Sequence, residues 1–150
     1  SSLPVLLIRK EEMSTLLVIA RVLFALLFIS SGLSHLTKVE AMSGYAQFKK
    51  VPAPKLAVIV TGIMIILGGL YVALGVYADL GALFLAIFLL LTAFMMHNFW
   101  TISDPQAKQG ETINFFKNLS LAGAALIIFV LVGQGVDFGP SITGAFFNLK

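Results

Sequence analysis

The chain contains no cysteine and few charged residues. Of its 150 residues only 11% are Asp, Glu, Lys or Arg, whereas 59% are hydrophobic. Without cysteine there is no disulfide, dithiol redox centre, thiolate zinc site or cysteine-ligated iron–sulfur cluster. A soluble domain is about 25% charged and about 45–50% apolar, so this composition excludes a surface that faces water on all sides. The outer surface is therefore expected to face lipid.

A basic run with interleaved aromatic residues is also missing. The formal net charge is only +3, and a nucleic-acid site needs clustered cations on one face. The sequence therefore excludes nucleic acid as a partner. The scattered lysines are typical of residues that flank membrane spans and meet lipid headgroups, so membrane lipids are the expected partners.

Four apolar segments are long enough to cross a bilayer. Each has roughly the 20 residues that a ~30 Å hydrocarbon core requires. In lipid such segments form helices, because every backbone polar group needs an internal partner. We predict an all-α integral membrane four-helix bundle with spans at about Thr15 to Leu36, Leu56 to Val76, Leu80 to Trp100 and Leu119 to Gly135.

The segments between the spans differ in length and pattern. The segment from Val39 to Phe48 is weakly amphipathic and precedes Pro52, which predicts a short interfacial helix between the first two spans. The expected organisation is an N-terminal extension (1–14, with Met13 before a good helix), a four-helix transmembrane domain (15–135) and a C-terminal interfacial tail (136–150). An even number of spans puts both termini on one side of the membrane. A group of lysines in the first and third connections favours a cytoplasmic location for those connections: Lys38, Lys49, Lys50, Lys55, Lys108 and Lys117.

Polar residues gather at the end of the bundle opposite the termini. Polar groups inside or beside membrane spans are costly, so they suggest a functional site. We expect a pocket there, roofed by the segment around Tyr45 and Phe48. Its expected polar residues come from three span ends and two connections: His35, His97, Asn98, Lys117, Asn118, Glu40 and Glu111. The alternative is an interfacial belt, in which these side chains only reach the headgroups.

The residue types in this group match the needs of a quinone headgroup. Lys117 and Asn118 can donate hydrogen bonds to ring carbonyls, and Phe99 and Trp100 can stack on a flat ring. His97 can pass a proton near neutral pH, with His35 or Glu40 as a relay. Arg21, near the other membrane face, is expected either to anchor the bundle from inside or to extend to the headgroups.

Other chemistries have weaker support in the sequence. Haem with two axial histidines needs them at matching depth on facing helices, whereas both histidines lie near helix ends, so haem is not expected. No His-x-x-x-His or carboxylate cluster points to a metal site. No pairing of a nucleophile with a base is visible.

Two blocks near the polar end resemble the DoxX family of small bacterial and archaeal membrane proteins. They are Met96-His97-Asn98-Phe99-Trp100 and Phe115-Phe116-Lys117-Asn118-Leu119-Ser120-Leu121. The likeness extends from about Ala20 to Leu126 and includes Arg21, Ser31-Gly32-Leu33, Val51-Pro52-Ala53-Pro54 and Leu67-Gly68-Gly69-Leu70. Two positions depart from the family: Ile65 stands where members often have glutamate, and Asp79 stands where many have a basic residue.

The resemblance implies a four-helix subunit of the bacterial or archaeal inner (cytoplasmic) membrane. Some members are associated with thiosulfate:quinone oxidoreduction and others with oxidative-stress or thiol-redox assemblies. The leading interpretation is a subunit of a redox-linked complex that holds a quinone or lipid near His35, His97, Phe99, Trp100, Lys117 and Asn118, with Arg21 and Glu40 as structural polar residues. If redox-active, it would be an accessory subunit of a quinone-linked oxidoreductase. The alternative is a purely structural accessory subunit that packs against other transmembrane proteins. A small transporter is disfavoured, because broken helices and midplane charges are missing.

Overall fold

The chain folds into helices only. A computed structural model describes residues 2–150, and within these residues there is no strand. Four helices have the length and composition to cross a membrane, which confirms the predicted all-α membrane bundle. The predicted short helix between the first two spans is also present. The elements are α1 (Leu3–Thr37), α2 (Val39–Phe48), α3 (Pro54–Leu74), α4 (Ala78–Met96), η1 (Phe99–Thr101) and α5 (Pro105–Gly133).

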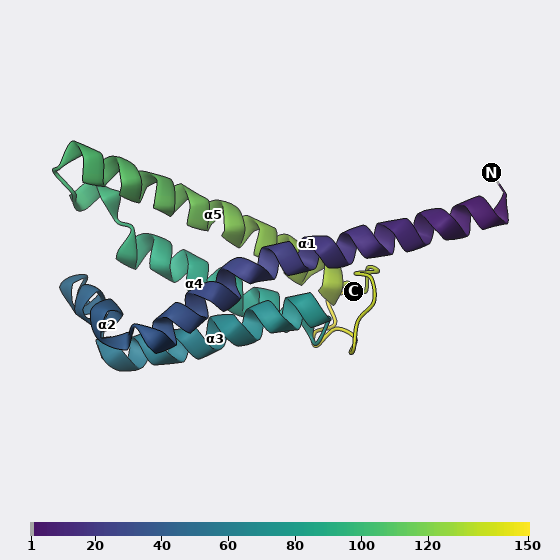
Figure 1. Cartoon of the computed structure of the whole chain (residues 1–150), viewed down its shortest axis with the longest axis horizontal. Coiled ribbons are helices and arrows are strands. Elements are labelled where there is room, and N and C mark those ends of the chain that lie inside the picture. The colour runs from purple at the N-terminus through teal and green to yellow at the C-terminus, as the bar shows by residue number, and fades with distance from the viewer. Residues whose placement is uncertain (1) are drawn as a thin grey trace.

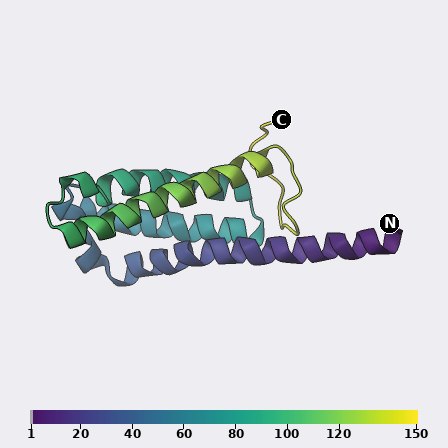
Figure 2. The same ribbon diagram turned by 90° about the horizontal axis from the view of Figure 1, so that it is seen from above.

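The long helices pack in a sequence of neighbours. α1 lies along α3, α3 along α4, and α4 along α5 (Figures 1 and 2). α2 and η1 lie at one end of the bundle, and both termini lie beyond the other (Figure 1). We call these the α2 end and the tail end. The placement of both termini at one end agrees with the even number of spans.

Glycines allow the closest helix approaches. A Cβ atom at Gly32 on α1 would lie 2.7 Å from the carbonyl oxygen of Gly62 on α3, and one at Gly81 on α4 would lie 2.9 Å from that of Gly68. Such small residues let membrane helices pack backbone to backbone. The α1–α3 and α3–α4 pairs are therefore held close by positions where no side chain fits.

The helix that contains the fourth span begins earlier than hydropathy indicates, at Pro105 and not at Leu119. Asp104 caps the helix by accepting a hydrogen bond from the Ala107 amide at 2.9 Å, and Pro105 fits the first helical turn. Polar residues therefore continue the helix beyond the apolar span. Residues 105–117, which were expected to lie in the connection between the third and fourth spans, are helical, because local capping decides where the helix starts.

Arg21 joins three parts of the chain at the tail end. Its side chain is buried, with 3% exposed. Nε and Nη2 donate to the carbonyls of Val72 and Ala73 in the last turn of α3, at 3.0 and 2.8 Å. Nη1 donates to the carbonyls of Phe138 and Pro140 in the tail, at 3.1 and 2.7 Å. Arg21 thus supplies donors to the C-terminal carbonyls of a neighbouring helix and fixes the tail against them.

Asp79 holds the tail at a second point. This carboxylate has no exposed surface and accepts hydrogen bonds from the amides of Phe146 and Phe147, at 2.9 and 2.8 Å. The Thr143 amide also donates to the carbonyl of Gly75 at 3.0 Å. Residues 134–150 therefore form a fixed cover over the ends of α3 and α4.

The first part of α1 projects from the bundle (Figure 1). α1 is continuous from Leu3, so the expected boundary between residues 14 and 15 lies inside one helix. Its 35 residues give a length of about 52 Å, well beyond a ~30 Å hydrocarbon core. Leu3, Leu6 and Ile8 are exposed on this projecting part.

Candidate functional site

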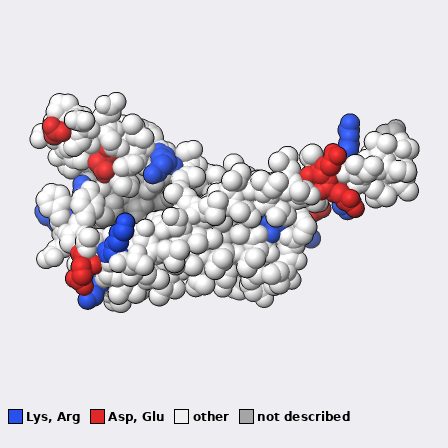
Figure 3. Space-filling model, in the orientation of Figure 1, with Lys and Arg blue, Asp and Glu red and all other residues white. Residues whose placement is uncertain are grey.

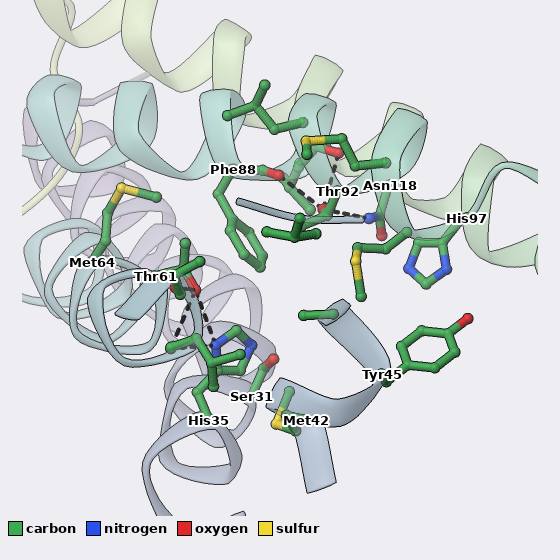
Figure 4. Close-up of a pocket in the computed structure, with 18 of the residues that line it drawn as sticks. Ser31, His35, Met42, Tyr45, Thr61, Met64, Phe88, Thr92, His97 and Asn118 are labelled. Atoms are coloured by element: carbon green, nitrogen blue, oxygen red, sulfur yellow. Dashed lines mark hydrogen bonds between the residues drawn. The ribbon is translucent and has the colours of Figure 1, made fainter. Parts of the chain in front are cut away.

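A cavity lies at the α2 end of the bundle, where the pair α1/α3 diverges from the pair α4/α5. Its volume is about 700 Å³, within the range of sites for small molecules. Its walls are mainly apolar, with a few polar groups that point inward (Figure 4). The polar side chains that line it are Ser31, His35, Tyr45, Thr61, Thr92, His97, Lys117 and Asn118.

His35 provides the polar group of the α1/α3 wall. It is buried, and its Nδ1 lies 3.0 Å from the carbonyl oxygen of Val58 and 3.2 Å from Oγ1 of Thr61. A carbonyl oxygen only accepts, so this contact assigns the proton to Nδ1 and leaves Nε2 as an acceptor in the neutral ring. Gly62 makes room for the ring, because a Cβ there would lie 2.6 Å from the His35 Cβ. Nε2 thus stays available to a ligand.

Asn118 provides the polar group of the opposite wall. It is buried on α5, and its Nδ2 donates to Oγ1 of Thr92 at 3.0 Å. The Thr92 hydroxyl in turn donates to the carbonyl of Phe88 at 2.8 Å. These bonds fix the amide plane, while its second N–H and its Oδ1 remain for a ligand. Figure 4 shows His35 and Asn118 on opposite sides of the cavity.

A pair of titratable groups lies at the mouth of the cavity. Nδ1 of His97 lies 2.8 Å from Oε2 of Glu111, and the amide of Asn114 donates to the other carboxylate oxygen at 3.1 Å. A carboxylate on Nδ1 fixes the orientation of the imidazole. Burial, and then the negative charge of Glu111, raise the pKa of the nearby Tyr45 phenol, which therefore remains a hydrogen-bond donor at neutral pH.

α2 covers part of the mouth of the cavity. Tyr45 lines the cavity from this helix, and Nζ of Lys49 donates to Oδ1 of Asn98 at 2.7 Å. This bond links the end of α2 to the segment that follows α4. The interfacial helix is thereby attached to both halves of the bundle.

The residues proposed from the sequence divide into two groups. His35, His97, Lys117 and Asn118 come together at the cavity. Phe99 and Trp100 do not line it. The chain leaves the helix at His97 and turns into η1, so their rings pack edge-on against Phe115, with centroids 5.4 and 5.5 Å away.

The two residues proposed as structural polar groups lie apart from the cavity. Glu40 pairs with Lys55 at 3.2 Å on the exposed surface, and neither residue lines the cavity. Arg21 lies at the tail end. A relay through Glu40 therefore has no geometric basis, whereas Glu111 contacts His97 directly.

Several lining residues were not singled out from the sequence. Thr61 and Thr92 orient the polar groups of the two walls, and Phe28 and Phe88 flank the space between them. Threonines within apolar spans were the available signal. Of the five methionines of the chain, all except Met13 line this cavity: Met42, Met64, Met95 and Met96. Methionine adapts its shape to what it contacts, so the apolar wall is compliant.

The chain is similar to a known family of membrane proteins. The DoxX family model matches residues 16–98. The chain is 31% identical to the inner membrane protein YphA of Escherichia coli over 120 residues, which are 80% of this chain and 84% of that protein. It is also 31% identical to the E. coli inner membrane protein YqjF over 117 residues, 78% and 83% of the two chains. No solved structure matches the chain.

Proposed function

The chain belongs to the DoxX family and is an integral inner-membrane protein, and from this premise we propose that it holds a quinone headgroup in the cavity at the α2 end. The observation that carries the proposal is the pair of polar groups on opposite walls. His35 stands on α1 and Asn118 on α5, with an apolar space between them. A quinone ring has the matching chemistry, because its two oxygens lie at opposite ends of a flat apolar ring.

The polar groups suit both oxidation states of such a ring. The hydroxyls of the reduced form donate, and Nε2 of His35 and Oδ1 of Asn118 can accept. The carbonyls of the oxidised form accept, and the second N–H of Asn118, the Tyr45 hydroxyl and the Lys117 ammonium can donate. Phe28 and Phe88 supply aromatic walls for the ring.

His97 and Glu111 give this site a connection to the aqueous side. The pair lies at the mouth, where both side chains are partly exposed, and an imidazole can both accept and donate a proton. The proposed role is therefore that of a quinone-holding subunit of a redox-linked membrane complex. Electrons would reach the ring from a partner subunit.

The proposal is tested by removing the polar side chain of each wall separately. We expect His35→Leu and Asn118→Leu each to weaken quinone binding about tenfold, because each removes one hydrogen bond worth about 1 kcal/mol and leaves a ring oxygen without a partner. Binding is measured by titrating the purified protein in detergent, without oxygen, with a ubiquinol, whose two hydroxyls donate to Nε2 of His35 and Oδ1 of Asn118. Asn148→Leu, in the tail at the far end of the bundle, is the matched control. Undiminished affinity in both wall variants would refute the quinone site.

A purely structural accessory role is the second candidate. It is favoured by the projecting part of α1, where Leu3, Leu6 and Ile8 are exposed beyond the bundle. If this segment joins the chain to a larger assembly, deleting residues 2–12 releases the partners while the quinone titration stays unchanged. Blue native electrophoresis of mild-detergent extracts separates these outcomes.

A further inference from the structure

The cavity occupies one half of the membrane thickness. Its innermost lining residues, Leu27, Met64 and Phe88, lie near the middle of α1's membrane-crossing part, of α3 and of α4. Its outer lining residues, which include Tyr45 and His97, lie at the α2 end. The space therefore extends from headgroup level to about the midplane, which is the depth occupied by one lipid of a single leaflet.

One side of the bundle is open at this depth. Within residues 2–150, α1 and α5 are not packed along each other, unlike the three neighbouring pairs of long helices. Figure 3 shows a hollow between the two lobes at the α2 end, with basic side chains on both rims. Leu27, an inner lining residue on α1, keeps 45% of its surface exposed. The cavity wall is thus continuous with the surface that faces lipid.

Polarity changes along the length of this opening. The polar groups, His35 and Asn118, lie toward the α2 end, and Leu27 lies eight residues before His35, or about 12 Å closer to the midplane. Ser31 lies between Leu27 and His35. The opening is therefore polar where the headgroup of a bound lipid-like molecule would lie. It is apolar where the hydrocarbon tail of that molecule would pass into the bilayer.

From this arrangement, and resting on the proposed quinone site, we propose that the ligand is a long-tailed quinone that enters sideways from one leaflet between α1 and α5. Its ring reaches His35 and Asn118, while its isoprenoid tail passes over Leu27 into the surrounding lipid. The tail thus contributes to occupancy without any polar contact. The four methionines that line the cavity can adapt their shape, so quinone rings with different substituents can fit.

The absence of cysteine from the chain allows a direct test. Single variants Ser31→Cys, next to the ring, and Leu27→Cys, under the tail, are placed in liposomes and labelled with a lipid-soluble maleimide. Leu33→Cys is the control, because Leu33 is exposed on α1 and does not line the cavity. Labelling rates are compared without quinone, with a long-tailed ubiquinone, and with the same ring lacking its tail.

At a free quinone concentration ten times Kd, about one site in ten stays open. We expect the long-tailed quinone to slow labelling of both Ser31→Cys and Leu27→Cys about tenfold, and the tail-less ring to slow only Ser31→Cys. Leu33→Cys should label at one rate throughout. Protection of Ser31→Cys without protection of Leu27→Cys by the long-tailed quinone would overturn the sideways path and leave the quinone site standing.

Other outcomes separate this path from the site itself. No protection of either cysteine by either quinone would overturn both proposals. Slow labelling of Leu27→Cys in quinone-free liposomes, indifferent to both quinones, would identify a phospholipid as the occupant and overturn the long-tailed quinone.

Discussion

The Arg21→Met variant is expected to lose about 3 kcal/mol or more of unfolding free energy, together with the fixed position of the tail. Methionine keeps the aliphatic stem but provides no donor. Four carbonyl oxygens, two in the last turn of α3 and two in the tail, lose the side chain that satisfies them. A buried carbonyl without a donor costs about 1–3 kcal/mol. Relief from burying the guanidinium charge offsets part of this loss.

Two measurements check this result. Unfolding in mixed micelles with increasing SDS gives the stability, and limited proteolysis at residues 134–150 reports on the tail. Arg9→Met is the matched control, because Arg9 is exposed on the projecting part of the same helix. Arg21→Lys should behave like Arg21→Met, since one ammonium cannot replace the planar fork that reaches two parts of the chain. Wild-type stability and an intact tail in Arg21→Met would show that the hydrogen bonds of Arg21 are dispensable.

Replacing Gly32 with leucine is expected to separate α1 from α3. A Cβ at this position would lie 2.7 Å from the carbonyl oxygen of Gly62, and this neighbour is backbone that cannot rotate away. Overpacking of this kind costs about 1–3 kcal/mol, and more where helices must move. Because His35 stands one turn further along α1 and packs against Gly62, its ring should also leave its place on the cavity wall. We therefore expect reduced stability and weaker quinone binding in the same variant.

Gly123 on α5 provides the control for this experiment. A Cβ at Gly123 meets nothing within 4 Å, so Gly123→Leu adds the same side chain to a membrane helix without a clash. SDS titration and the ubiquinol titration are run on both variants. Equal behaviour of the two leucine variants would contradict the role of close backbone contact between α1 and α3.

Hydropathy was sufficient to predict the spans, because lipid demands long apolar helices whatever their packing. It was insufficient for the start of α5, which depends on the cap at Asp104 and on Pro105. The end of α4 at Met96 was also not predicted. This helix end decides that Phe99 and Trp100 pack against Phe115 and lie away from the cavity.

The sequence predicted which polar residues lie at the candidate site, but not which groups they contact there. The predicted topology put four of them at one end of the bundle, and in the structure these four line one cavity: His35, His97, Lys117 and Asn118. Which carboxylate meets His97 depends on the helical turn before Phe115, which puts Glu111 within 2.8 Å. The carbonyls that Arg21 meets in the tail lie more than a hundred residues away, and no local pattern indicates such a pairing.

The contact between Arg21 and the tail also has a consequence for biosynthesis. During synthesis Arg21 leaves the ribosome before α3, α4 and α5 do, and Phe138 and Pro140 follow more than a hundred residues after it. While the rest of the chain is being made, Arg21 lies in the bilayer before two of its four acceptors exist. A cation in lipid without its hydrogen-bond partners is unfavourable. A chain that stops short of these residues keeps that defect permanently. A chain that contains Phe138 and Pro140 is thereby distinguished from one truncated before them by the side chain of Arg21.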